Sequence, residues 1–400
     1  MRYLLLVFFF GVYQTAFLQL NFNTTNQLLW EVKKKGQKKP SYVFGTIHLN
    51  DSKLFKFSDS VYYAFNNTVF FSPEIDIHDL FDLYSTRLNT NLLVDANNRI
   101  YKGTNWTDKK GYGSPTGWPQ FLDAYFYQIA VNSNKKVIPL ESLNDQVSAI
   151  QSIVFSDYLG RRSFSEEDMI DIYLTGNIYQ LQQLIYQGFK GSNGYDELIV
   201  KRNNKMADKI DSIAKSGSTF VAVGAGHMSG KYGILTLLKQ KGYEVRPVGT
   251  TYTENLKNEK EFFKAHHSYI YKDTALRFEM KFGMKPVFSM DDEFIHLESR
   301  DLGQGNVYIL EVEKIMDENL LINYFLDENF YQPVNATIER LTLEDGTEAY
   351  EGIVEIVEYG LCRKRILIRN GYLYKLTCSG GLPFLNSNRP ATFFNGLKFY

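Results

Sequence analysis

An excess of positive charge is absent from this 400-residue sequence, which has 44 Lys and Arg residues against 45 Asp and Glu residues and a net charge of -1. Nucleic-acid-binding proteins usually carry a basic surface, so this balance argues against a nucleic-acid partner. Long apolar runs are absent after residue 20, and no later segment is expected to span a bilayer. Histidine and cysteine are scarce, with six and two residues, so few positions can carry imidazole or thiol chemistry.

The first twenty residues differ in composition from the rest of the chain. Arg2 precedes an apolar run, residues 3–13, which has the length and charge pattern of a secretory signal peptide. Gln14 and Thr15 interrupt this run before it reaches the length of a membrane span. We therefore expect residues 1–20 to direct export to the periplasm, the cell surface or the medium. The segment is a cleaved signal peptide or an uncleaved anchor, and any membrane contact is made through it alone.

Two short segments share the pattern Gly-x-x-His at the end of an apolar run. They are residues 45–48 and 224–227, and none of the other four histidines has a glycine three positions before it. Imidazole is a common metal ligand and general base, and glycine lets a backbone or a ligand approach closely. If the fold brings His48 and His227 together, they form a site.

The sequence around both motifs is typical of an α/β fold. Residues 28–32 and 42–47 are apolar segments separated by a basic stretch, which predicts two strands joined by a turn. Residues 219–223 form a continuous apolar run, as in strands that are buried on both faces. The pattern of residues 230–241 predicts a helix, with Gly242 as its C′ residue.

Two further strands are predicted to end beside acidic residues. Residues 69–71 run into Pro73, which cannot donate to a ladder, so this strand should end there and leave Glu74 at its carboxyl edge. Residues 136–140 lead directly to Glu141. If all these strands lie in one largely parallel sheet, their terminal side chains share one rim. Two histidines and a carboxylate would then form a workable ligand set for a divalent metal, namely His48, His227 and Glu74.

Each candidate residue also has an alternative role. Either histidine could simply hydrogen-bond backbone carbonyls at a strand end. Asp76 would face the same side of an extended chain as Glu74 and could serve as the ligand instead. Glu141 stands just before a predicted helix, where the helix dipole favours an acidic residue without any chemistry. Arg202 lies in a predicted helix, residues 195–215, and is either solvated or a partner of a carboxylate or oxyanion.

Five stretches resemble the TraB/PrgY/GumN family, which includes the Tiki proteins, in their order and rough spacing: residues 30–32, 42–48, 139–146, 201–207 and 220–227. The resemblance covers residues 28–248. It implies a fold similar to that of the erythromycin-esterase and ChaN group, with a mixed, largely parallel sheet and helices. By analogy with Tiki proteins, it also implies a metallopeptidase that uses both Gly-x-x-His motifs and an acidic residue. The implied ion is of the manganese or cobalt type, with zinc as the alternative.

The remaining sequence indicates a second, smaller domain. We expect residues 25–250 to form the α/β domain, residues 251–260 a linker and residues 261–400 an accessory α+β domain with an antiparallel sheet. Short alternating or apolar runs predict its strands, at residues 276–281, 306–312, 336–343, 350–358, 362–369 and 372–378, and a helix is expected at residues 313–328. This part has no recognisable catalytic constellation, and we interpret it as a substrate-facing or surface-binding domain.

The two cysteines flank a predicted hairpin turn at Asn370 and Gly371. A two-residue turn would make Cys362 and Cys378 face away from each other, whereas a three-residue loop with Gly371 in the left-handed position would place them opposite one another. Only the second register brings the alternating apolar residues of both strands onto one face. Because an exported protein is oxidised, we predict a disulfide between Cys362 and Cys378.

These observations predict an exported metal-dependent hydrolase, with a peptidase as the preferred class and a peptide or protein as its substrate. A divalent ion on His48, Glu74 and His227 would activate water, with Glu141 as general base and Arg202 bracing the rim. The competing hypothesis is a non-catalytic protein that sequesters a secreted peptide or assists polysaccharide export through the same cleft.

Overall fold

The computed structural model describes residues 27–49, 51–79, 121–151, 165–189, 193–252, 256–291, 293–300, 306–315, 322–330, 338–356, 359–380 and 382–400. The predicted export segment, residues 1–20, lies outside these ranges. Within them, no helix combines the length and the apolar character that crossing a membrane requires.

Six strands form the sheet of the N-terminal part, in the order β4 (Lys136–Val137), β3 (Phe70–Pro73), β5 (Thr219–Gly224), β2 (Ser41–Thr46), β1 (Leu29–Lys34) and β6 (Tyr243–Pro247). The first four strands are parallel to one another, whereas β1 is antiparallel to both β2 and β6. The sheet is therefore mixed and largely parallel, which confirms the α/β prediction at this level.

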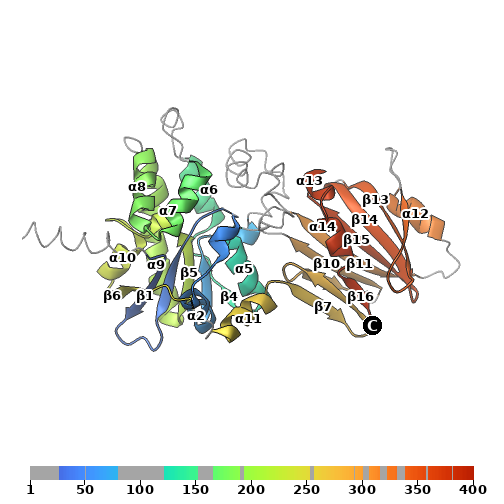
Figure 1. Ribbon diagram of the computed structural model, residues 1–400, viewed down its shortest axis with the longest axis horizontal. Coiled ribbons are helices and arrows are strands. Elements are labelled where there is room, and N and C mark those ends of the chain that lie inside the picture. Colours follow the sequence, from blue (N-terminus) through green and yellow to red (C-terminus); the bar gives the residue numbers. More distant parts are fainter. Residues whose placement is uncertain are drawn as a thin grey trace, which may run out of the picture.

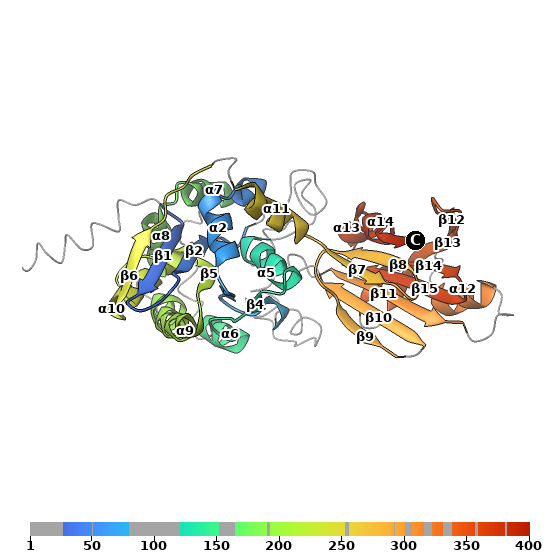
Figure 2. The ribbon, with the colours of Figure 1, turned by 90° about the horizontal axis from the view of Figure 1, so that it is seen from below.

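Helices surround this sheet, and Figures 1 and 2 show α2 and α11 on the other side of it from α6 and α9. In chain order the helical elements are η1 (Ser52–Phe55), α2 (Asp59–Asn67), α5 (Leu122–Asn132), α6 (Leu143–Gln151), α7 (Glu166–Leu174), α8 (Ile178–Phe189), the π-helical η3 (Asp196–Lys201), α9 (Arg202–Ser216), η4 (Ala225–His227), α10 (Ile234–Gln240) and α11 (Lys257–Ala265). The helix predicted over residues 195–215 is thus a π-helical turn followed by an α-helix.

Local sequence accounts for several of these boundaries. Strand β3 ends at Pro73, whose missing N–H cannot continue the ladder. Gly242 follows α10 with a φ of +86°, the left-handed conformation that a C′ glycine supplies without strain. Strand β5 is buried along nearly its whole length because sheet neighbours and helices enclose it on all sides.

Two antiparallel sheets form the C-terminal part. The seven-stranded sheet has the order β12 (Glu339–Thr342), β13 (Glu348–Ile356), β14 (Gly360–Arg369), β15 (Tyr372–Ser379), β11 (Val307–Lys314), β10 (Phe294–Arg300) and β9 (Val287–Met290). The three-stranded sheet has the order β16 (Leu397–Phe399), β8 (Phe278–Phe282) and β7 (Tyr269–Asp273), and the helices are α12 (Ile322–Phe330), α13 (Leu382–Leu385) and α14 (Arg389–Phe394). The helix predicted at residues 313–328 began too early, because β11 stays paired with β15 as far as Lys314.

The seven-stranded sheet has a hydrophobic core on each face, although its edge strands β9 and β12 are largely exposed. One face packs against the three-stranded sheet and helices α13 and α14, with Phe278 and Tyr374 in that core. The other face packs against α12, whose Phe325 contacts a second cluster that includes Ile366. Apolar side chains therefore point in both directions from strands β14 and β15.

The predicted disulfide and the register on which it depended are both wrong. Arg369 pairs with Tyr372 across a two-residue turn in which Asn370 and Gly371 have φ values of +52° and +77°, as a type I′ turn requires. Cys362 packs in the core under α12 and Cys378 in the core on the opposite face, and they form no disulfide. The apolar alternation misled the prediction because it assumed a single buried face.

Helix α11 joins the two parts of the chain. Its Phe263 packs into the N-terminal core against Phe65 and Phe126, and the domain boundary predicted at residue 261 lies within this helix. The Asn132 side chain at the end of α5 donates to the Gly283 carbonyl at 3.0 Å and accepts from the Lys285 amide at 2.8 Å. Figures 1 and 2 both place α5 and α11 at the end of the N-terminal part that faces the C-terminal part.

The position of the two cysteines predicts their reactivity. Burial raises the pKa of Cys362 to about 11 and that of Cys378 further, so both should react slowly with thiol reagents in the folded protein. After denaturation without a reductant, Ellman titration should count two thiols per chain. A count of zero would restore the disulfide and contradict the two-residue turn.

Candidate metal centre

The carboxyl ends of β2, β3 and β5 meet at one rim of the sheet because the three strands are parallel neighbours. His48 lies two residues after β2, Glu74 directly follows β3, and His227 ends the short turn η4 that follows β5. Glu141 lies beside Glu74, since its amide donates to the Glu74 carbonyl at 2.9 Å. The condition on which the predicted site depended, one largely parallel sheet, is therefore met.

Gly224 marks the point around which three of the predicted residues converge. A Cβ atom placed on Gly224 would lie 3.2 Å from Glu74 Oε1, 3.5 Å from His227 Cδ2 and 3.9 Å from His48 Nε2. Both imidazoles thus come within 4 Å of a single point beside the Glu74 carboxylate. Glycine leaves that point open, and any other residue would fill it.

Asn203 on α9 fixes the orientation of the His227 ring. The Asn203 Nδ2 group donates to the carbonyls of His227 and Tyr232, so its Oδ1 atom is the acceptor that faces His227 Nδ1 at 2.6 Å. This network assigns the hydrogen to Nδ1 and leaves a lone pair on Nε2. Burial lowers the pKa of His227 to about 4, so the neutral ring is the stable form.

Asp123 in the first turn of α5 holds the His48 ring in the corresponding way. Asp123 Oδ2 lies 3.0 Å from His48 Nδ1, and its Oδ1 accepts from the Thr46 hydroxyl at 2.7 Å. Desolvation acts to lower the pKa of His48, but the Asp123 and Glu74 carboxylates outweigh it and raise that pKa to about 9. The His48 side chain is 46% exposed, so solvent or a ligand can reach it. Asp123 was not among the residues predicted for the site, because in the sequence it looks like any acidic residue in a first helical turn.

Glu74 is buried and held by three groups. Its Oε1 atom accepts from the Gly224 amide at 2.6 Å and lies 3.9 Å from His227 Nε2, while its Oε2 accepts from Arg202 Nη2 at 3.0 Å. Burial would raise the pKa of this carboxyl, but His227, Arg202 and His48 outweigh it and lower the pKa to about 2. Asp76, the alternative ligand, instead accepts from the Tyr127 hydroxyl and the His78 amide.

Arg202 connects Glu74 to Glu141. Its Nε donates to both Glu141 carboxylate oxygens at 3.0 Å, and its Nη2 bonds to Glu141 as well as to Glu74. The side chains of Arg202, Glu74 and Glu141 are 8%, 6% and 1% exposed. Burial raises the pKa of Glu141 and the guanidinium opposes this effect. Glu141 is thus engaged by Arg202 and shielded from solvent, which favours a positioning role over that of a general base.

The side chains at this rim match the ligands of a divalent metal in kind, but they are not yet close enough together to hold one. Across the described part of the chain, no group of three His, Cys, Asp or Glu side chains is already gathered closely enough to hold an ion. The donors that surround the space at Gly224 nevertheless fit a divalent transition metal in kind, because they are two imidazoles and one ionised carboxylate. Each imidazole also has its Nδ1 tied to a neighbouring side chain, as metal-ligating histidines usually do.

Comparison with known proteins finds similarity to one family and to two metalloproteases. Residues 106–247 match the model of the TraB/PrgY/gumN family, a segment that contains Glu141, Arg202 and His227 and begins after His48 and Glu74. Metalloprotease TIKI2 of Danio rerio is 23% identical over 316 residues, which cover 55% of this chain and 60% of that protein. Metalloprotease TIKI2 of Xenopus tropicalis is 44% identical over 62 residues, 14% of this chain and 12% of that protein.

The chain therefore spans about 60% of the length of the Danio rerio relative that it matches. Among solved structures, cyanobacterial PsbP from Synechocystis sp. PCC 6803 aligns with 33% of this chain and 92% of its own, at 13% identity and a TM-score of 0.25, which is too low to assign a fold. Residues 106–247 match the model of the TraB/PrgY/gumN family, which confirms the resemblance seen in the sequence motifs.

Proposed function

We propose that this protein is a metal-dependent hydrolase of the peptidase class, with a manganese- or cobalt-type ion held by His48, Glu74 and His227 and zinc as the alternative ion. The observation that carries the proposal is the state of the two imidazoles. Each has its Nδ1 engaged by a neighbouring side chain, Asp123 or Asn203, and each has its Nε2 near the space beside Glu74. His227 is neutral there, whereas an ion on His48 would replace the proton that the raised pKa leaves on that ring at neutral pH. The Danio rerio relative, a metalloprotease by name, supports the same class of reaction.

When bound, the ion supplies the Lewis acidity that activates water for attack on a peptide carbonyl. The residues of the chain provide the geometry. Asp123 and Asn203 fix the two rings, and the Gly224 amide together with Arg202 fixes the Glu74 carboxylate from two directions. Because these groups are held before substrate arrives, little reorganisation is needed during the reaction.

Arg202 and Glu141 are assigned a positioning role in this proposal. The guanidinium bridges two buried carboxylates, so Glu74 is kept ionised and its Oε1 stays directed at the space beside Gly224. Glu141 in turn holds the guanidinium in place. The general-base role predicted for Glu141 would require Arg202 to release it first.

We also propose a wider assignment that the sequence first suggested. Residues 25–250 form a domain of the erythromycin-esterase and ChaN type, residues 261–400 serve as an accessory domain, and residues 1–20 direct export. The partner is a peptide or protein substrate rather than a nucleic acid. The mixed, largely parallel sheet and the balanced charge support this assignment. The competing function, a non-catalytic binder that uses the same cleft, predicts binding of peptide without turnover.

Replacing either histidine should separate metal binding from folding. The variants His48→Ala and His227→Ala should lose bound metal and any peptidase activity, because each removes a ligand, while the free energy of unfolding changes by no more than about 2 kcal/mol. Metal content is measured by plasma mass spectrometry after loading with Mn²⁺ or Co²⁺ in chelator-free buffer, and His266→Ala is the matched control. Unchanged metal content together with a large loss of stability would show that the histidines are structural.

The space beside Gly224 can be filled with a single methyl group. Gly224 has φ −51° and ψ 130°, which alanine adopts without strain, so Gly224→Ala should fold normally. Its Cβ would crowd Glu74 Oε1 at 3.2 Å, and we expect the affinity for Mn²⁺ to fall at least about tenfold. Gly249→Ala is the control, since nothing lies within 4 Å of a Cβ there. Equal Mn²⁺ affinity in the two variants would place the metal elsewhere.

Asp123→Asn tests the support of His48. The substitution keeps the shape of the side chain but removes the charge that orients Nδ1, and it should weaken Mn²⁺ binding by about 10- to 100-fold. The affinity for Mn²⁺ is obtained from a titration that is monitored by electron paramagnetic resonance. Asp145→Asn, at a 40% exposed side chain paired with Lys205, is the matched control. An affinity equal to that of the control would remove Asp123 from the site.

A further inference from the structure

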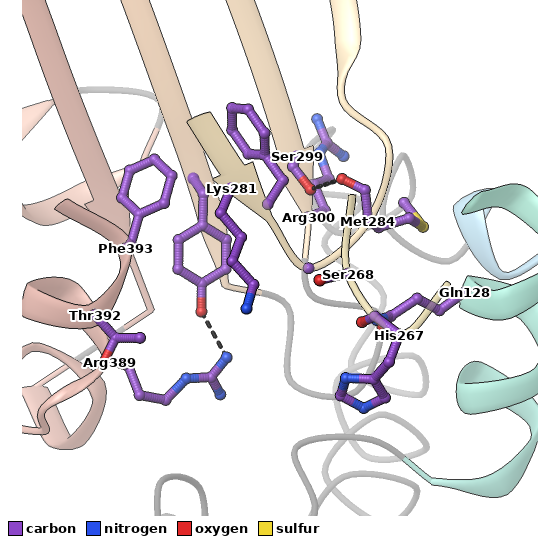
Figure 3. Close-up of a pocket in the computed structure, with 13 residues that line it drawn as sticks. Gln128, His267, Ser268, Lys281, Met284, Ser299, Arg300, Arg389, Thr392 and Phe393 are labelled. Carbon is purple, nitrogen blue, oxygen red and sulfur yellow. Dashed lines mark hydrogen bonds between the residues drawn. The ribbon is translucent and has the colours of Figure 1, made fainter. Parts of the chain in front are cut away.

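A cavity of about 300 Å³ lies where α5 faces the C-terminal part. Its wall includes Gln128 of α5, His267 and Ser268 before β7, Lys281 at the end of β8, and Arg389 and Phe393 of α14. Figure 3 shows these side chains around one space, with Lys281 and Arg389 on one side and His267 on the other. None of the residues of the candidate metal centre lines this cavity.

The cationic groups of Lys281 and Arg389 lie in the same part of this cavity. Figure 3 shows the Lys281 amino group and the Arg389 guanidinium directed toward each other. The Tyr308 hydroxyl accepts from Arg389 Nη2 at 2.8 Å and so fixes the direction of the guanidinium. The Lys281 charge also reaches the opposite wall, because it adds to burial in lowering the pKa of His267.

The described residues of the wall include several basic side chains. No Asp or Glu is among the described residues that line the cavity. Arg300 also lines it, but its Nε is paired with Glu298 Oε1 at 2.7 Å and its guanidinium points away from the other two cations in Figure 3. Burial lowers the pKa of the Arg389 guanidinium, and an anion bound beside it would favour its charged form.

The rest of the wall is apolar or uncharged. Phe282 and Phe393 pack together with ring centroids 5.8 Å apart, and the Tyr308 ring lies tilted against Phe393 with a centroid distance of 5.1 Å. Met284 lines the same space. A ligand that fits this surface has an anionic head and a compact apolar body, in agreement with the usual make-up of small-molecule sites.

We propose that this cavity binds a small organic anion, whose carboxylate or phosphate group lies between Lys281 and Arg389 and whose apolar body contacts Phe282 and Phe393. A guanidinium and an ammonium are the side chains that proteins use to recognise such oxyanions. The site is separate from the proposed metal centre and requires neither metal nor catalysis.

Isothermal titration calorimetry of the full chain tests the proposal with three probes that share one aromatic body. Benzoate and phenyl phosphate carry the two candidate anionic groups, and benzyl alcohol is the neutral analogue. At least one anion should bind saturably and more weakly as the salt concentration rises, whereas benzyl alcohol should not bind measurably. The anion that binds more tightly identifies the source as a carboxylate or a phosphate.

Variants on the wall link binding to this cavity. Lys281→Gln and Arg389→Gln should each weaken anion binding about tenfold, and Arg389→Lys should recover part of the loss. Arg340→Gln, at an exposed position on β12, should leave binding unchanged. If Arg389→Gln fails to fold, Lys281→Gln decides alone, because its side chain is exposed.

Three results would overturn the proposal: no saturable binding of either anion, equal binding of benzyl alcohol, or wild-type affinity in the folded wall variants. Because the titration measures neither metal content nor turnover, its result is independent of the proposed peptidase function.

Discussion

The parallel pairing of β5 with both β2 and β3 is the constraint on which the candidate site depends. Neighbouring parallel strands end at the same edge of a sheet, so His48, Glu74 and His227 reach one rim although up to 179 positions separate them in the sequence. If β3 ran antiparallel, Glu74 would lie at the opposite edge. Burial of β5 within the sheet and beneath the helices holds this central strand in place.

A single guanidinium links the stability of this rim to its chemistry. Glu74 and Glu141 are both buried, and two buried carboxylates would repel each other without Arg202 between them. Removing one partner of a buried ion pair typically costs about 3–5 kcal/mol, which is a large part of the stability of a domain. The hydrogen bond from Arg202 that offsets the repulsion between the two carboxylates also orients Glu74 toward the histidines. The fold and the site therefore rest on the same interaction.

The hairpin of β14 and β15 illustrates what a local pattern cannot decide. Alternating apolar residues indicate a register only if one face of the sheet is buried. Here Ile366 packs under α12 and Tyr374 packs against the three-stranded sheet, so apolar residues occupy both faces and both registers satisfy the pattern. The turn residues Asn370 and Gly371 indicate the register more reliably than the apolar pattern does. A two-residue turn requires positive φ values, and these two residue types adopt such values as a local property.

The sequence by itself determined the strand ends, the two Gly-x-x-His motifs and the order of elements in the α/β part, since apolar runs, Pro73 and Gly242 act over a few residues. The resemblance to a family followed from the same motifs. Only the tertiary structure assigned Asp123 to His48 and Asn203 to His227, and it paired Arg202 with two carboxylates rather than with solvent. These partners lie on separate helices, and a hydrogen bond depends on the separation of two atoms in space, which no local pattern encodes.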